Sequence, residues 1–130
     1  MAKDKKGAQT TAKPLAWLHG EIKTPPFTQE GRKEAGYLLR LLQQGEKLGM
    51  PQAEPLPIVG PRCGALRVRD GGHHWRIMVR VDRDAVLLVE VYAKKTRKIP
   101  QEIIDRCQKR LKDYDEAVKK APKEPPMNQA

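Results

Sequence analysis

Alternating apolar and basic residues in the middle of the chain constrain its fold more than any other feature. Leucine and valine alternate with arginine over 66–69, and a second alternating run covers 75–81. A period of two is typical of a β-strand, and Asp70-Gly71-Gly72 between the runs predicts a hairpin. After a turn at 82–84, a third strand is predicted over 85–92, and its residues 86–89 are apolar on both faces, as in a central strand. The sequence therefore predicts a three-stranded antiparallel meander.

Two amphipathic segments flank the meander and predict a helix on each side of it. Thr28 is a suitable N-cap for a helix that runs to about Gln44. Apolar residues share one face of it: Ala35, Leu38, Leu39 and Leu42. Pro100 suits the first turn of a second helix. Its apolar stripe is Ile103, Cys107, Leu111, Tyr114 and Val118. We therefore expect an α+β fold, a small antiparallel sheet of three or four strands packed by an N-terminal and a C-terminal helix.

The remaining segments set the expected domain limits. Leu15 to His19 is compatible with an edge strand, and 49–64 has four prolines and predicts a connecting loop. Residues 1–14 are basic and polar, and 121–130 are rich in proline, so both are predicted to be flexible tails around one domain at 15–120. The longest apolar run is far shorter than the roughly 20 residues of a membrane span. We expect a cytoplasmic protein without membrane contact.

Charge and cysteine content restrict the chemistry. The net charge is +10, and +7 remains when 1–14 and 121–130 are left out, which favours nucleic acid or an acidic protein as partner. Cys63 and Cys107 have no second ligand at metal-binding spacing, and no phosphate-binding, zinc-protease or serine-hydrolase motif occurs. We therefore predict no metal site and no cofactor.

The basic residues of the meander form the candidate site. Alternation places four arginines on the face opposite the apolar set: Arg67, Arg69, Arg76 and Arg80. The third strand ends in further cations, including Lys94 and Lys95. Such a surface either binds an anion or is merely solvated, and the shortage of interleaved carboxylates favours the anion site. Arginine suits phosphate because its planar fork donates two parallel hydrogen bonds. Four contacts to single-stranded RNA would make binding strongly salt-dependent.

Three further side chains have open roles. Tyr92 is placed either to stack a base or to pack in the core. His73 and His74 are predicted to lie in the Gly-Gly turn and to point to opposite sides, so at most one of them can act as a general base. An exposed turn without function is the alternative for both.

The order of these features resembles the phage-derived HigB branch of RelE-type toxins over about residues 15–116. The resemblance is carried by 93–103 (Ala-Lys-Lys-Thr-Arg-Lys-Ile-Pro-Gln-Glu-Ile), by Leu66-Arg67-Val68, by Trp75-Arg76-Ile77 and by the last helix from Arg110 to Tyr114. It implies a RelE-like fold and the toxin of a type II toxin-antitoxin pair. Such toxins cleave mRNA in the ribosomal A site without metal, and the partner is a helix-turn-helix antitoxin.

The same resemblance implies residue roles. Arg67 and Arg76 match positions that hold the scissile phosphate, and Lys95 matches the basic position after the last strand. Arg69 and Lys94 match more weakly. Residues 96–106 contain neither the tyrosine nor the histidine that such toxins carry there, so the general base stays open among Lys95, Tyr92 and His74. Two alternative functions remain, a gyrase-inhibiting toxin of the related ParE branch and a passive RNA-binding protein.

Overall fold

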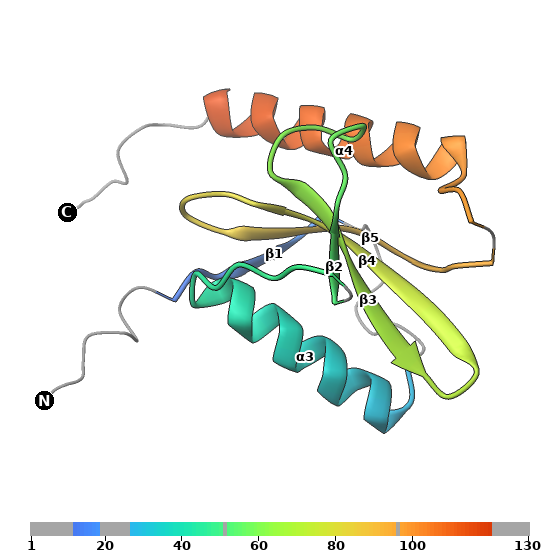
Figure 1. The fold of residues 1–130 in the computed structure, drawn as a ribbon. Helices are drawn as coiled ribbons and strands as arrows, with labels where there is room; N and C mark the ends of the chain where they lie inside the picture. Colours follow the sequence, from blue (N-terminus) through green and yellow to red (C-terminus); the bar gives the residue numbers. More distant parts are fainter. Residues whose placement is uncertain (1–11, 19–26, 51, 96, 121–130) are drawn as a thin grey trace, which may run out of the picture.

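The computed structural model describes residues 12–18, 27–50, 52–95 and 97–120. The elements of this part are β1 (Leu15–Trp17), α3 (Gln29–Gln43), β2 (Ala53–Pro55), β3 (Cys63–Asp70), β4 (His73–Val81), β5 (Val86–Ala93) and α4 (Gln101–Lys120). The strands form one sheet in the order β1-β5-β4-β3-β2, with α3 on one face and α4 on the other (Figure 1). The predicted α+β class and the β3-β4-β5 meander are confirmed. The predicted tails, apart from residues 12–14, lie outside the described residues and stay a prediction.

Each helix buries its apolar stripe against one face of the sheet. Leu38, Leu39 and Leu42 of α3 pack on the β3–β5 side chains of the first core, and Leu38 is almost fully buried. Ile103, Ile104, Cys107 and Leu111 of α4 form the second core with Ala65, Met78, Leu87 and Val89. Burial of each such leucine or isoleucine contributes about 1.5–3 kcal/mol. Both faces of the hairpin are therefore apolar in part, whereas the sequence predicted one apolar face.

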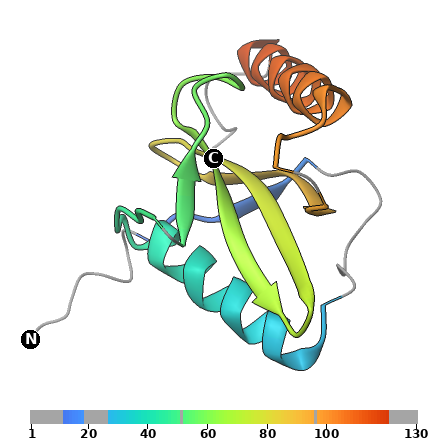
Figure 2. The ribbon, with the colours of Figure 1, turned by 45° about the vertical axis from the view of Figure 1, so that its right-hand side comes forward.

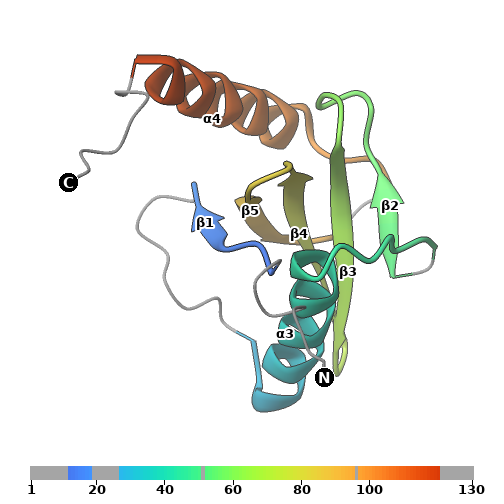
Figure 3. The same ribbon diagram turned by 90° about the vertical axis from the view of Figure 1, so that its left-hand side faces the viewer.

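The two outer strands differ from expectation in informative ways. β1 forms at the predicted position but pairs in parallel with β5, so the sheet is mixed. β2 lies within the segment predicted to be a loop, and it pairs antiparallel with β3 at the other edge (Figure 3). Its proline is tolerated there because an edge strand has one unpaired side. Gly64 allows the close approach, since a Cβ at that position would lie 3.0 Å from the Glu54 carbonyl oxygen.

A β-bulge in β5 decides which side chains face α4. Met78 pairs with Glu90, but the next residue of β4, Val79, pairs with Leu88. The extra residue, Val89, interrupts the two-residue period of β5. As a result Leu87, Val89 and Tyr92 all contribute to the α4 core, and Glu90 binds arginines of α4.

Asp70 connects the start of α3 to the β3–β4 hairpin. Its carboxylate accepts a hydrogen bond from the Thr28 backbone N–H at 2.8 Å and another from the Thr28 hydroxyl. Thr28 is the N-cap of α3, as predicted, and its hydroxyl also accepts from Gly31 N–H at 3.3 Å. Gly31 has to be a glycine here, because a Cβ would lie 2.7 Å from the Asp70 carboxyl group.

Within the described residues, no helix combines the length and apolar character of a membrane span.

The α4 stripe ends at Tyr114, because Val118, which was predicted to belong to it, is exposed.

We predict that Asp70 stabilises the protein only while it is ionised. The hydrogen bonds from the Thr28 hydroxyl and backbone hold the pKa of Asp70 below its ordinary value. A depressed pKa means that the contribution is complete above the unfolded pKa of about 3.9 and is lost as the pH falls through the folded value. Asp70→Asn should therefore lower the free energy of unfolding at neutral pH, and the difference from wild type should shrink in acid. Urea unfolding across pH measures this, and a pH-independent difference would contradict it.

Candidate functional site

Two rows of polar side chains cross the α4 face of the sheet at the hairpin end. Arg67 of β3 pairs with Arg76 of β4, and Arg76 pairs with Tyr92 of β5. In the next row Arg69 pairs with His74, and the Lys94 N–H donates to the His74 carbonyl oxygen at 2.7 Å. The tip of the β3–β4 hairpin lies far from α4, beside the start of α3 (Figures 1 and 2). The helix therefore leaves this end of the face uncovered.

The two rows border an open pocket of about 330 Å³, here called the arginine pocket. It is lined by Gln52, Arg67, Val68, Arg69, His74 and Arg76. Three of its six residues are arginines from two strands, and the described chain places no carboxylate in its lining. The sequence prediction that cations gather on one face thus holds for Arg67, Arg69 and Arg76.

Arg76 is the most buried arginine of the pocket. It is only 8% exposed, and its guanidinium donates to the Trp75 carbonyl oxygen at 3.4 Å. No carboxylate among the described residues pairs with it. Burial, and then the neighbouring charge of Arg67, lowers the pKa of Arg76. A buried cation beside a second cation is costly for folding, so its presence points to a function in binding an anion.

Arg67 is oriented by an acidic neighbour. One of its terminal nitrogens lies 3.3 Å from the Glu54 carboxylate, and both side chains are about one-third exposed. The Nε atom of Arg67 is buried and has no partner in the described part of the chain. Arg67 is therefore held on one side and retains hydrogen-bonding capacity on the other.

Tyr92 lies in the row of Arg67 and Arg76 but is not an open stacking platform. Its ring packs on the α4 core, and its hydroxyl is buried without a partner in the described chain. Burial raises the pKa of Tyr92, against the opposing charge of Arg76. Of the two roles left open, packing describes the ring, while the unpaired hydroxyl remains available to a ligand.

The adjacent histidines point to opposite faces, as expected from alternation. His73 stacks near Trp75, with ring centroids 6.1 Å apart, and His74 lines the arginine pocket. Both lie in β4 and not in the turn, which is formed by Gly71 and Gly72 alone. The φ of 63° at Gly71 explains a glycine at this position.

The two lysines after β5 differ in their relation to the pocket. Lys94 extends the second row through its hydrogen bond to the backbone of His74 and is half-buried. Lys95 is exposed beyond the end of β5 and is not part of the pocket lining. The structure thus brings Lys94 beside the arginines and leaves Lys95 at the rim of this region.

Arg80, predicted to contact the ligand, has a different role. Its guanidinium is buried and donates to Asp82 at 2.9 and 2.8 Å and to Asp115 of α4 at 3.0 and 2.8 Å. Tyr114 lies beside it, with the ring centroid 5.9 Å from the guanidinium carbon. The hydrogen bonds to Asp115 and Asp82 raise the pKa of Arg80. The expectation of an RNA contact at Arg80 is wrong because both carboxylates already occupy its donors, and Met78 separates it from Arg76 along β4.

Neither cysteine contributes to the site. Both are free and buried in the α4 core. Burial raises the pKa of Cys63 and raises that of Cys107 to about 12. Such thiols are poor nucleophiles. No group of three or more metal-ligating side chains occurs among the described residues.

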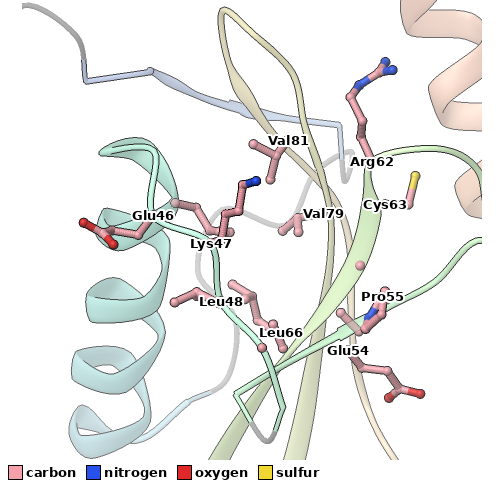
Figure 4. A pocket seen from close by; sticks show the side chains of 15 residues that line it. Glu46, Lys47, Leu48, Glu54, Pro55, Arg62, Cys63, Leu66, Val79 and Val81 are labelled. Atoms are coloured by element: carbon pink, nitrogen blue, oxygen red, sulfur yellow. The ribbon is translucent and has the colours of Figure 1, made fainter.

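A larger pocket of about 510 Å³ lies on the other side of β3 and has a different character. It is lined by apolar side chains such as Leu48, Leu66, Val79 and Val81, with Glu46 and Lys47 at its edge (Figure 4). Its lining lacks the convergent cations of the arginine pocket. Glu54 of β2 also lines this pocket, and Figure 4 shows its carboxylate at the margin, directed away from Leu66 and Val79.

Sequence reasoning missed two residues of the site, Gln52 and Glu54. The Gln52 carbonyl oxygen accepts the Arg67 N–H at 2.8 Å, and Glu54 binds the Arg67 side chain. Glu54 belongs to β2 and Gln52 directly precedes this strand, in the segment predicted to be a loop. Three residues of β2 are too few for alternation to reveal a strand.

Residues 26–112 match the family described as phage-derived protein Gp49-like (DUF891). The chain belongs to this family. The family is a toxin-like member of the RelE/HigB superfamily, which implies an antitoxin partner. No curated protein sequence matches the chain. The phage-derived resemblance carried by the residues around 66–103 is thereby supported at the level of the family, and the fold is consistent with a RelE-like one.

We predict opposite stability effects for two buried arginines of β4. Arg76→Met removes an unpaired charge, so the free energy of unfolding should stay the same or rise. Arg80→Met leaves Asp115 without its donor and Asp82 with Arg62 alone, and it should lower the free energy of unfolding by roughly 1–3 kcal/mol. Chemical denaturation of the two variants measures the contrast. An equal decrease in the free energy of unfolding of both variants would mean that Arg76 is a structural residue.

Proposed function

We propose that this protein is a toxin that cleaves RNA as a metal-independent endoribonuclease, with the arginine pocket as its site. The resemblance described above implies that the RNA is mRNA in the ribosomal A site. The observation that carries the proposal is Arg76, a buried guanidinium without a carboxylate partner among the described residues, directly opposite Arg67.

The pocket has the chemistry that a scissile phosphate requires. Arg67 and Arg76 present donors from neighbouring strands, so two guanidinium groups can contact one phosphate. Charge on the phosphate increases when the 2′-oxygen attacks, and donors already held in place by the sheet stabilise that state. A cationic donor set takes the place that a divalent cation holds in metal-dependent nucleases. Arg69 and Lys94, in the second row, are placed to contact the adjoining backbone.

Lys95 keeps a proposed role near the rim of the pocket. As an exposed cation after β5, it is suited to contact the RNA backbone or the leaving oxygen. Substitution of Lys95 tests whether its side chain contacts the substrate.

We predict that RNA binding depends on salt through the three arginines of the arginine pocket and Lys94 beside it. If Arg67, Arg69, Arg76 and Lys94 each contact a phosphate, log K against log salt should have a slope near −2.8, from about −0.7 per contact. Removing any one of them should reduce the slope by about 0.7. Fluorescence anisotropy with a short RNA measures it. Arg83→Ala is the matched control, because Arg83 is exposed in the turn at the far end of β4.

We predict cleavage that requires the pocket arginines and the 2′-hydroxyl. Brief expression in bacteria should produce new mRNA ends in phase with codons. Arg76→Ala should lower the cleavage rate by about 100- to 1000-fold, as expected for loss of one donor to the transition state. Lys95→Ala should lower it as well, while Arg83→Ala should cleave like wild type. Sequencing of mRNA ends is the measurement.

The same experiment separates the alternative functions. Intact transcripts together with induced DNA damage would favour a gyrase-inhibiting toxin. Intact transcripts and no growth defect would favour passive RNA binding. Either result would falsify the endoribonuclease proposal.

A further inference from the structure

We propose that Glu54 is the general base of this site, the carboxylate that accepts the 2′-hydroxyl proton during cleavage. This inference rests on the proposed endoribonuclease function and adds a catalytic residue to it. It also assigns the general base, for which the sequence left three candidates: Lys95, Tyr92 and His74.

Glu54 lies on the same face of the sheet as the arginines. It pairs in register with Ala65 of β3, whose side chain is part of the α4 core, and Arg67 is the next residue of β3 on that face. The Glu54 carboxylate lies 3.3 Å from the Arg67 guanidinium. Figure 4 shows the carboxylate at the margin of the apolar pocket, directed away from Leu66 and Val79. β2 thus places a carboxylate at the margin of the arginine pocket.

The charge of Glu54 also acts on the first row beyond its contact with Arg67. After the larger effects of burial and of neighbouring side chains, its charge raises the pKa of both Arg76 and Tyr92. The charged and titratable groups that face it are therefore Arg67 from β3, Arg76 from β4 and Tyr92 from β5. Its side chain is 37% exposed, so a bound RNA can reach it.

The other candidates for the base are less well placed. Tyr92 has its pKa raised by burial, which disfavours the phenolate that a base requires. Neither Lys95 nor Glu54 is part of the pocket lining, but Lys95 is exposed beyond the end of β5, whereas Glu54 binds Arg67 directly. His74 lies in the second row, beside Arg69, whereas Glu54 binds a guanidinium of the first row. A carboxylate oriented by an arginine that also contacts the phosphate is positioned for proton transfer from the neighbouring ribose.

The proposed step is a transesterification that needs no other reactant. Glu54 accepts the proton of the 2′-hydroxyl, and the 2′-oxygen forms a bond to phosphorus. The bond between phosphorus and the 5′-oxygen breaks, and that oxygen takes a proton from water or from protonated His74. The products are a 2′,3′-cyclic phosphate and a 5′-hydroxyl end. Arg67 and Arg76 neutralise the charge on the phosphoryl oxygens during the step.

Glu54→Gln tests the proposal because it preserves shape and removes the base. Single-turnover cleavage of ribosome-bound mRNA should slow by about 100- to 10,000-fold, the range of general-base catalysis. RNA affinity should stay equal or increase, since a negative charge beside the phosphate is lost. The acid limb of the wild-type pH–rate profile, where a carboxyl group becomes protonated, should disappear. Glu54→Asp should recover part of the rate.

Glu46→Gln is the matched control, an exposed carboxylate at the apolar pocket, and it should cleave like wild type. If Glu54→Gln cleaves at the wild-type rate, or keeps the acid limb, Glu54 is not the base, although the proposed function stands. If Glu54→Gln slows cleavage only through weaker RNA binding, Glu54 merely orients Arg67 and the inference is overturned. A wild-type protein that cleaves no RNA, with or without ribosomes, overturns both proposals.

Discussion

The pairing of Arg67 with Arg76 is the interaction on which the rest of this structure depends. Like charges directly opposite each other on neighbouring strands are destabilising, and here one of them is also buried. The described chain supplies one carboxylate, Glu54, at the edge of this pair and none at its centre. The remainder of the fold has to hold the two strands together against this repulsion, which keeps the two guanidinium groups side by side at the proposed site.

The structure separates its cations into two groups by their partners. Arg80, Arg106 and Arg110 bind carboxylates that join α4 to the sheet: Arg80 binds Asp115, and the two helix arginines bind buried Glu90. Arg69 and Arg76, at the hairpin end, have no such partner among the described residues. Asp70 and Thr28 fix that end from the opposite face. Paired cations thus stabilise the position of the helix, and cations that α4 does not cover form the proposed site.

The periodic segments of the sequence predicted most of the fold. The helices α3 and α4 and the strands β3, β4 and β5 form where period and capping residues indicated, because each has enough residues to show its pattern. β2 was missed since three residues show no pattern, and with it Glu54 was missed. Arg80 was misjudged for a different reason. Alternation assigns a side chain to a face, but it cannot reveal that α4 covers part of that face and brings Asp115 to the guanidinium.

By itself the sequence determined the meander, its two amphipathic helices and the face on which Arg67, Arg69 and Arg76 lie, because these follow from local periodicity. Only the tertiary structure decided which cations stay unpaired, since that depends on where α4 crosses the sheet. It also decided the position of Tyr92. Uninterrupted alternation from Leu88 would place that ring toward α3, and the bulge at Val89 turns it toward α4 and Arg76. Bulges and contacts between elements arise from packing across the sheet, which no local pattern records.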